Sequence, residues 1–576
     1  MNQIEVSSDL VHTLHGIAGT APDRPALIFV DYGASREGVA VTASFGELDR
    51  RARALAVRLA GEFGPGSSAA ILCPHGPDYV VAFLGCLYAG VVAAPLFPPD
   101  QFRGNLGLTA ILADFQPRCL LITAAVKSNV AALTAPGPPA LVIVDEPGGE
   151  GADRWQSPDL QAQPLAYVQY TSGSTRVPAG VRITHRNLMA AVAQMRERWE
   201  YTEDNIGVSW LPYFHDMGLV SGIALPLGSG GRAVHLTPYA FLQRPYRWLR
   251  LISEYRADWS AAPNFALDLC VRRVTEEQKG RLDLSGLGVL CNGAEPIRLA
   301  SLDAFSAAFE SAGFAPAAHS SGYGLAEATL TVTSSIGGVV VGTFDRVALG
   351  VGRVRPCPQD DPMAWRIVSA GTPLRNVVVQ IVDPVTRASV PAGAAGEIWA
   401  RGPNVGDGYW HLPERTAEVF GGRLGGALGR GEEPWLRTGD VGFLHEGELY
   451  ITGRIKDLII VDGRNHYAAD LEITVEHADP ELWPRNVAAF GVDGEGDERL
   501  VILAELRRDV IDDSGRHDRF LRAARRALAI HHGVEPHDVV LVPPGALPRT
   551  TSGKVRRGTC RERYLDGGFA AAEYLR

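Results

Sequence analysis

A cluster of small hydroxyl residues and glycine stands directly after a strand-like run. Thr171, Ser172, Gly173, Ser174 and Thr175 follow Ala166–Tyr170 and precede Pro178 and Gly180. In such a stretch, backbone N–H groups and hydroxyls can converge on phosphate oxygens. Most Ser/Thr/Gly clusters are ordinary loops, and the chain has neither a Walker-type G-x-x-x-x-G-K-[ST] motif nor a clean G-x-G-x-x-G fingerprint. Phosphate binding here is therefore one of two interpretations.

A lysine on a Gly/Ser turn lies close to the other end of the sequence, in Pro548–Lys554 (PRTTSGK). Such a lysine is normally a solvated charge, but a turn of this composition would also place a mobile cation at a loop tip. Three further short motifs lie between the two: Gly322–Glu327 (GYGLAE), Thr438–Asp440 (TGD) and Gly453–Asp457 (GRIKD). Taken singly, each of them is a turn.

Strand-like apolar runs alternate with helical stretches through the first half of the chain. This alternation predicts parallel sheets that are covered by helices. The runs are Ala69–Leu72, Cys119–Thr123, Leu141–Val144, Ala166–Tyr170 and Gly288–Cys291.

Residues 79–97 carry no charge over nineteen positions, which is long enough to suggest a membrane span. Gly85, Gly90 and Pro95 interrupt this run. We therefore expect a buried helix that ends near Ala89 and a short buried strand at Val91–Ala94, because a strand buried on both faces is apolar throughout. No stable membrane insertion is expected.

The character of the sequence changes after residue 376. Short strand candidates separated by turn residues predict a small antiparallel, barrel-like unit. They are Val377–Val382, Gly396–Ala400, Val441–Leu444 and Glu448–Ile451. The residues from Asp457 onward are expected to form a separate α+β unit.

Charge is unevenly distributed along this last unit. Residues 457–513 contain 15 acidic and 5 basic residues, whereas residues 514–576 contain 6 acidic and 12 basic residues. Four arginines lie within Asp518–Ile530. The basic stretch is either a solvated helix face or a docking patch for an acidic partner.

The 576 residues are enough for several domains. The formal net charge of −10 argues against a nucleic-acid partner, because phosphate backbones favour basic surfaces. The seven cysteines are scattered without Cys-x-x-Cys spacing. That distribution argues against a zinc site and fits a reducing cytoplasm.

Taken together and in this order, the motifs resemble those of the adenylate-forming superfamily of acyl-CoA synthetases, luciferases and adenylation domains, over nearly the whole chain. Within it, the sequence is most similar to the fatty acyl-AMP ligases. The stretches that carry this resemblance are Thr175–Gly180 (TRVPAG), Trp210–Gly218 (WLPYFHDMG), Ala262–Ala266 (APNFA) and Gly463–Tyr467 (GRNHY).

The resemblance implies an α/β architecture with two parts. A large N-terminal domain, residues 1–455, would contain helix-covered parallel sheets and a small β-barrel subdomain. A mobile α+β domain, residues 456–576, would turn about a hinge at Lys456. The 68 residues between Glu327 and Gly396 would include an insertion at about 341–365 that is typical of these ligases; an ordinary surface hairpin is the alternative.

The activity that the resemblance implies is the joining of a medium- or long-chain fatty acid to ATP, giving acyl-AMP and pyrophosphate with the help of Mg²⁺. A carboxylate is already ionised at neutral pH, so neither a nucleophilic side chain nor a general base is needed. An anion must attack a polyanion, which makes positioning and cationic stabilisation the catalytic task. The acyl group would then pass to the phosphopantetheine of an acyl carrier protein, which would act in trans because only 22 residues follow Lys554.

Site residues follow from the same resemblance. Lys554 would bridge the carboxylate and the α-phosphate, and His215 would sit near the reacting carboxylate unless its role is only structural. Thr171 and Glu327 would hold Mg²⁺, Asp440 and Arg454 would bind the ribose, and Tyr323 would stack on adenine. The remaining expected residues are Ser172, Gly173, Ser174, Thr175, Gly293, Ala294, Glu295, Gly322, Gly324 and Leu325 for the nucleotide, and Met217, Gly218 and Phe265 for the acyl chain. The sequence departs from the usual glycine and lysine of the phosphate loop at Arg176 and Ala179.

Three rival functions remain at this point. The first is an acyl-CoA synthetase of the same fold that uses free CoA. The second is an amino-acid-activating domain, for which no acidic partner of a substrate ammonium group is recognisable. The third is a non-catalytic nucleotide-binding regulator, which the presence of Lys554, Glu327 and Asp440 disfavours.

Overall fold

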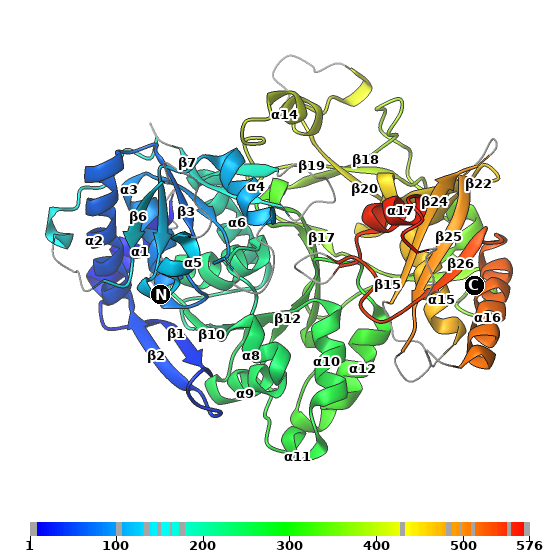
Figure 1. Ribbon diagram of the computed structural model, residues 1–576, viewed down its shortest axis with the longest axis horizontal. Helices are drawn as coiled ribbons and strands as arrows, with labels where there is room; N and C mark the ends of the chain where they lie inside the picture. Colours follow the sequence, from blue (N-terminus) through cyan, green and yellow to red (C-terminus); the bar gives the residue numbers. More distant parts are fainter. Residues whose placement is uncertain are drawn as a thin grey trace.

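The computed structural model describes residues 9–99, 106–131, 139–146, 151–161, 164–171, 179–426, 433–479, 486–494, 498–507, 513–549 and 554–569. Figure 1 shows a large α/β body that holds most of the chain, and a smaller body formed by the C-terminal elements beside it.

A six-stranded sheet forms one half of the large body, with hydrogen-bonded order β6-β5-β3-β4-β7-β8. Its strands pair in parallel except for β8, which returns antiparallel to β7. The strands are β3 (Ser68–Ile71), β4 (Val92–Pro95), β5 (Cys119–Ile122), β6 (Ala140–Ile143), β7 (Leu165–Tyr170) and β8 (Gly180–Thr184).

A nine-stranded sheet forms the other half, in the order β17-β14-β13-β12-β11-β9-β10-β1-β2. It is parallel from β1 to β13 along this order and antiparallel at both ends. The strands are β1 (Pro25–Asp31), β2 (Val39–Ser44), β9 (Ile206–Ser209), β10 (Arg232–His235), β11 (Trp259–Ala261), β12 (Val289–Asn292), β13 (His319–Gly324), β14 (Thr331–Ser334) and β17 (Thr372–Pro373).

Helices cover these sheets, as the alternating sequence pattern predicted (Figure 1). They are α1 (Leu10–Thr20), α2 (Phe45–Phe63), α3 (Pro77–Ala89), α4 (Leu106–Phe115), α5 (Lys127–Ala131), α6 (His185–Arg198), α7 (Leu225–Ser229), α8 (Pro238–Gln243), α9 (Tyr246–Tyr255), α10 (Asn264–Arg273), α11 (Glu276–Lys279) and α12 (Leu299–Phe309). Two short helices, α13 (Arg346–Gly350) and α14 (Pro413–Val419), instead contact strands of smaller sheets.

The apolar run at 79–97 is the buried helix α3 followed by the buried strand β4. Gly90 ends the helix in the left-handed conformation, which glycine adopts without steric cost. None of the helices in the described part of the chain combines the length and apolar character that a bilayer-spanning segment needs.

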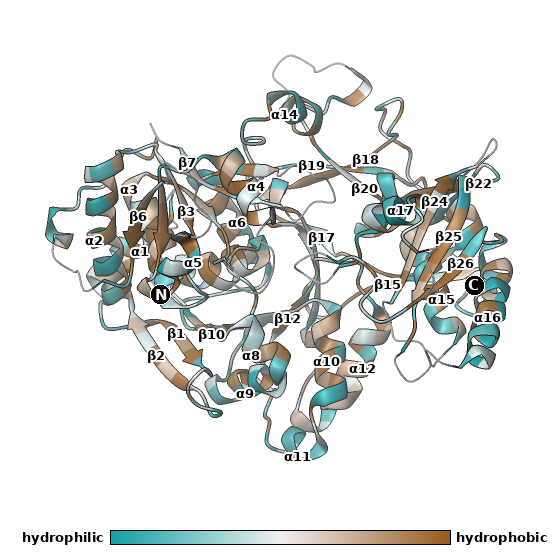
Figure 2. Ribbon diagram, viewed as in Figure 1, coloured by the Kyte–Doolittle hydropathy of each residue, from teal (hydrophilic) through white to brown (hydrophobic). Residues whose placement is uncertain are grey.

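The two faces of the six-stranded sheet belong to different cores. Ala69 and Ile71 of β3 point into the main core, which also contains residues of α2, α3 and the nine-stranded sheet. Their neighbours Ala70 and Leu72 point into a second core with residues of α4. This period of two is what a strand covered on both faces requires. Figure 2 shows hydrophobic colour concentrated on the strands and hydrophilic colour on outer helices such as α2 and α16.

Two smaller sheets follow in the N-terminal body. β15 (Val341–Asp345) and β16 (Ala364–Val368) form an antiparallel hairpin, at the position where an insertion is expected. β18 (Val378–Val382), β19 (Gly396–Arg401), β20 (Leu436–His445) and β21 (Glu448–Arg454) form a four-stranded antiparallel sheet. All four strand candidates after residue 376 therefore lie in one antiparallel unit.

The C-terminal body contains a hairpin and a three-stranded sheet with helices on both faces. α15 and α16 share one core with it, and the end of the chain around α17 shares the other. The elements are β22 (Leu458–Val461), β23 (Arg464–Tyr467), α15 (Ala468–Ala478), β24 (Val487–Asp493), β25 (Glu498–Glu505), α16 (Ser514–His532), β26 (Asp538–Val542) and α17 (Arg557–Leu565). The expected α+β unit after residue 456 is present.

The turn between β16 and β17 provides a test of the backbone geometry. Gly371 has a φ of +85°, and a Cβ on it would lie 2.1 Å from the carbonyl carbon of Ser334. Gly337 has a similar φ of +74°, but a Cβ there would meet nothing within 4 Å. Gly337→Ala should lower the free energy of unfolding by about 1 kcal/mol and Gly371→Ala by about 3 kcal/mol or more, since only the second adds a backbone clash to the left-handed strain. Urea unfolding of both variants compares them; equal losses would contradict this packing.

Candidate active site

A buried carboxylate on β20 lies at the centre of the site. Asp440 is 6% exposed, and two side chains hold it. The Tyr323 hydroxyl donates to Oδ2 at 2.7 Å, and Arg454 Nε donates to Oδ1 at 3.0 Å. Burial and the neighbouring Asp440 keep the pKa of Tyr323 well above its usual value, so the hydroxyl retains the proton that it donates. Each oxygen of an ionised carboxylate has a second lone pair, so Asp440 can accept two further hydrogen bonds.

Two glycine-containing loops meet beside Asp440 at the carboxyl ends of neighbouring parallel strands. Gly322, Tyr323 and Gly324 end β13, and Leu325 follows them. Gly293, Ala294 and Glu295 follow β12, which pairs with β13. A Cβ on Gly293 would lie 2.7 Å from the Gly322 carbonyl oxygen, so these backbones touch only because position 293 is glycine. The structure therefore brings together the two loops that hold these seven residues, and their role in binding a nucleotide stays a prediction.

Tyr409 links Glu327 to the hairpin that carries Thr171. The Tyr409 hydroxyl donates to Glu327 Oε1 at 2.6 Å, and Tyr409 also pairs with Val181 of β8 in an isolated antiparallel bridge. Thr171 stands at the end of β7, where its N–H donates to the Ala179 carbonyl at 3.2 Å. No sequence motif indicated Tyr409, because its partner lies 82 positions away.

The donor set of Glu327 and Thr171 fits Mg²⁺. It offers carboxylate and hydroxyl oxygens, and Mg²⁺ is commonly held by one or two carboxylates together with substrate phosphates. The hydrogen bond from the Tyr409 hydroxyl fixes the Glu327 carboxylate through one of its two oxygens, Oε1. Ser172, Gly173, Ser174, Thr175 and Arg176 lie outside the described residues.

His215 and Asp216 are neighbours whose side chains touch at the start of a π-helical segment, Met217–Ala224. His215 Nδ1 lies 2.6 Å from Asp216 Oδ1, and the Met217 N–H donates to Asp216 at 2.7 Å. Burial alone would raise the pKa of Asp216, but His215, the Met217 N–H and Lys554 outweigh it, so this pKa lies below its usual value. Asp216 is therefore a fixed negative charge.

Two of the residues expected to contact an acyl chain, Met217 and Gly218, directly follow this pair in the sequence. Met217 is buried, and a Cβ on Gly218 would lie 2.1 Å from the Pro212 carbonyl oxygen. Phe265, at the start of α10, is half-buried with its ring edge-on to Trp210 at a centroid distance of 5.8 Å. Gln169 of β7 donates to the Phe214 carbonyl at 2.8 Å and so ties this loop to the strand that leads to Thr171.

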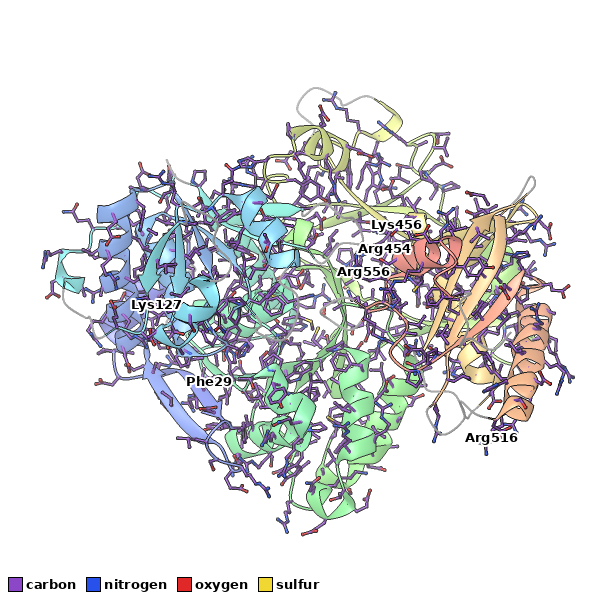
Figure 3. All side chains as sticks on the ribbon, viewed as in Figure 1. Phe29, Lys127, Arg454, Lys456, Arg516 and Arg556 are labelled. Atoms are coloured by element: carbon purple, nitrogen blue, oxygen red, sulfur yellow. The ribbon has the colours of Figure 1, made fainter. Side chains whose placement is uncertain are left out.

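Lys554 comes from the C-terminal body and is half-buried against the N-terminal one. The charges that act on it are Arg454, Asp216, Glu295 and Asp440. Burial, and then the Arg454 guanidinium, hold the pKa of Lys554 below its usual value, while the three carboxylates oppose that shift. Lys554 therefore does meet the distant loops that carry Asp216, Glu295 and Asp440. Lys456 stands in the single turn between β21 and β22, beside Arg454 at the junction of the two bodies (Figure 3).

Comparison with known proteins agrees with this arrangement. The profile of the AMP-binding enzyme family matches residues 15–410, and that of the Disco-interacting protein 2-like AMP domain matches residues 456–573. The chain is 41% identical to the long-chain-fatty-acid–AMP ligase FadD26 of Mycobacterium marinum over 96% of each chain. It is 40% identical to the medium-chain-fatty-acid–[acyl-carrier-protein] ligase JamA of Moorena producens, over 91% of this chain and 90% of that protein.

The chain belongs to the fatty acyl-AMP ligase family. The structure of a fatty acyl-adenylate ligase from Legionella pneumophila, in complex with acyl adenylate and pyrophosphate, matches this ligase with a TM-score of 0.75 and 34% identity over 98% of each chain. The resemblance inferred from the motifs, and the α/β fold class, are thereby confirmed.

The four lysines of this ligase, Lys127, Lys279, Lys456 and Lys554, allow the charge cluster to be tested by titration. In protein carrying ¹³C at lysine Cε, the NMR signal of Lys554 should titrate below the usual pH of a lysine side chain. Asp216→Asn removes a carboxylate that favours the ammonium form, so the pKa of Lys554 should fall further.

Lys456 is the internal control for this titration, because the charges that act on it are Arg454, Asp457, Asp440 and Arg415. Its signal should not move in Asp216→Asn. A Lys554 signal that titrates at the usual pH of a lysine side chain would show that Lys554 does not occupy the site in solution.

Proposed function

We propose that this enzyme activates a medium- or long-chain fatty acid with ATP and then transfers the acyl group to the phosphopantetheine thiol of an acyl carrier protein supplied in trans. The observation that carries the proposal is the half-buried position of Lys554 among Asp216, Glu295 and Asp440. It supports a site in which a cation from the C-terminal domain completes a nucleotide pocket built by the N-terminal domain.

In the first step a carboxylate oxygen of the acid attacks the α-phosphorus of ATP. The bond from that phosphorus to the oxygen bridging to the β-phosphorus breaks, and pyrophosphate leaves with its electron pair. Both reactants are anions, so the residues must place positive charge and hydrogen-bond donors where negative charge develops. Lys554 would contact both the carboxylate and the α-phosphate, and His215 would orient the carboxylate.

Asp440 and Arg454 would hold the ribose, with Asp440 accepting from the two ribose hydroxyls. The Tyr323 ring would stack on adenine while its hydroxyl fixes Asp440. Ala294 and Glu295 would line the same pocket. Mg²⁺ bound by Glu327 and Thr171 would neutralise phosphate charge, and Tyr409 would fix the orientation of the Glu327 carboxylate.

In the second step the thiol sulfur of the carrier attacks the acyl carbon. The bond from that carbon to the phosphate oxygen breaks, AMP leaves, and the thiol proton is released. Lys456 would absorb the backbone rotation that exchanges Lys554 for the carrier, because it stands in the single connection between the two bodies.

A basic face of the C-terminal domain supports an acidic carrier as the acceptor. Arg519, Arg522 and Arg526 are exposed at spacings of three and four along α16, so they share one stripe with Ile530, which is 49% exposed. The name of the JamA relative supports the same class of acceptor for that protein. An acyl-CoA synthetase would instead form acyl-CoA from free CoA, and a non-catalytic regulator would show no ATP–pyrophosphate exchange.

Replacement of Lys554 should separate the two steps. In Lys554→Ala, pyrophosphate release with fatty acid and ATP should fall about 10²- to 10³-fold, because a preorganised charge at the transition state is lost. Transfer from supplied acyl-AMP should change much less. Lys127→Ala, at an exposed lysine of the N-terminal domain, is the matched control and should behave as wild type. Near-normal pyrophosphate release by Lys554→Ala would contradict the assignment of Lys554 to the first step.

The acceptor can be tested by giving preformed acyl-AMP to the enzyme with either CoA or a phosphopantetheinylated carrier protein. Thioester should form on the carrier, and raising the salt concentration should increase KM for the carrier without changing KM for ATP. Reversal of the stripe, Arg519→Glu with Arg522→Glu and Arg526→Glu, should raise KM for the carrier about tenfold or more and leave adenylate formation intact.

The matched control for the stripe is a triple reversal at the exposed arginines Arg36, Arg50 and Arg366 of the N-terminal domain. It changes net charge equally and should leave KM for the carrier within about threefold of wild type. Efficient acyl-CoA formation, or equal effects of the two triple variants, would favour free CoA or a different docking face.

A further inference from the structure

An ion pair joins the two bodies at the back of the nucleotide pocket. Arg298 Nη1 donates to Glu476 Oε2 at 2.5 Å, and Nη2 lies 3.5 Å from Oε1. Arg298 stands directly before α12 in the N-terminal body, and Glu476 is on α15 in the C-terminal one. The side chains are 22% and 4% exposed. The contact is therefore a largely desolvated, two-pronged pair between segments 178 positions apart.

Arg298 is held in place by its own domain. Its N–H donates to Asn264 Oδ1 at 3.1 Å, and Asn264 Nδ2 donates to the Pro296 carbonyl at 2.9 Å. Asn264 is fully buried. One side chain thus clamps both ends of the segment 296–298, which continues directly from the pocket residues Ala294 and Glu295. The backbone that carries the guanidinium is therefore held where Arg298 can receive a carboxylate from the other domain.

The Arg298–Glu476 pair is also coupled electrostatically to Lys554. Glu295 acts on Arg298 and on Lys554. Glu476, Arg298, Glu295 and Lys554 therefore alternate in sign from the interface to the pocket. The pKa of Arg298 lies above its usual value because Glu476 and Glu295 outweigh its burial. The charge at position 298 is permanent, and no change of pH near neutrality switches it.

We propose that Arg298 is a positioning residue that recognises the C-terminal domain through Glu476 and holds it in the arrangement in which Lys554 enters the nucleotide pocket. This rests on the proposed two-step function. The pair must break whenever the C-terminal domain turns away, since Arg298 stays fixed to Asn264. It therefore stabilises the adenylating arrangement and not the transferring one.

The energetic reason lies in the burial of Glu476. A carboxylate that is 4% exposed loses most of its solvation, and without its guanidinium it is left as a poorly compensated charge at the interface. Arg298→Gln should therefore shift the domains away from the adenylating arrangement. Glu476→Gln should do the same from the other side, because Arg298 then loses the acceptor that orients it.

The experiment measures each half-reaction separately in full-length wild type, Arg298→Gln, Glu476→Gln and the charge-swapped double variant Arg298→Glu with Glu476→Arg. Both single variants should slow acyl-AMP formation about 10- to 100-fold at saturating ATP, with KM for ATP within about threefold of wild type. Transfer from supplied acyl-AMP should be unchanged or faster. The swapped variant should recover at least about tenfold over the single variants.

Hydrogen–deuterium exchange provides a readout that does not depend on catalysis. The amides of α15 should exchange faster in both single variants, and the swapped variant should restore protection. The matched control is Arg375→Gln, which breaks the exposed pair with Glu197 within the N-terminal domain, at 2.9 Å. It should behave as wild type in both half-reactions.

The failure of the proposed function can be distinguished from the failure of this inference. If wild-type enzyme forms no adenylate with any fatty acid, the proposed function fails and the variants are uninformative about catalysis. If the wild type is active but Glu476→Gln adenylates normally, the inference fails alone. Equal slowing of both half-reactions, or loss in Arg298→Gln without loss in Glu476→Gln, would likewise overturn it, because Arg298 would then act only within its own domain.

Discussion

The structure is organised around one electrostatic constraint: a fixed set of carboxylates needs a positive charge that the N-terminal domain supplies only in part. Asp216, Glu295 and Asp440 surround the point where Lys554 enters, and Arg454 is bonded to Asp440. Two anionic substrates meeting in such a pocket require further positive charge. Because Lys554 belongs to the C-terminal domain, the position of that whole domain is part of the proposed catalytic machinery.

Ion pairs between arginines and carboxylates hold the C-terminal domain in that position at several points. Arg346 of α13 binds Asp470 of α15 through two nitrogens, at 2.7 and 3.2 Å. Next to it, the Tyr467 hydroxyl donates to the Leu349 carbonyl at 3.1 Å. Both contacts join the C-terminal body to the segment between β15 and β16, whereas the Arg298–Glu476 pair joins it to the nucleotide pocket. The helix α15 is therefore held by ion pairs to two different parts of the N-terminal domain.

Local signals in the sequence were sufficient to place helices and strands, but not to predict which residues they contact. Gly90 placed the end of α3 correctly, because glycine acts on the backbone where it stands, whereas the strand expected at Val91–Ala94 is shifted by one residue to Val92–Pro95. The antiparallel strands β2, β8, β14 and β17 were not anticipated, since strand direction depends on the path of the chain between strands. Contacts such as Tyr323 with Asp440, 117 positions apart, depend on the whole fold. Tyr409 and Arg298 belong to this group and were missed for that reason.

The choice of cation follows the same physical logic. The sequence contains only four lysines among its 55 basic residues, and two of them, Lys456 and Lys554, lie at the domain junction and in the pocket. A guanidinium is a rigid fork that suits a permanent carboxylate partner, as at Arg298 and Arg346. An ammonium is a compact charge on a flexible stem, with three donors that can rotate among acceptors. A group that must enter a crowded anionic pocket, touch a carboxylate and a phosphate, and then withdraw needs the second kind of cation. In a chain that otherwise uses arginine almost throughout, lysine at position 554 therefore suits the proposed contact, which would be made and released in each cycle.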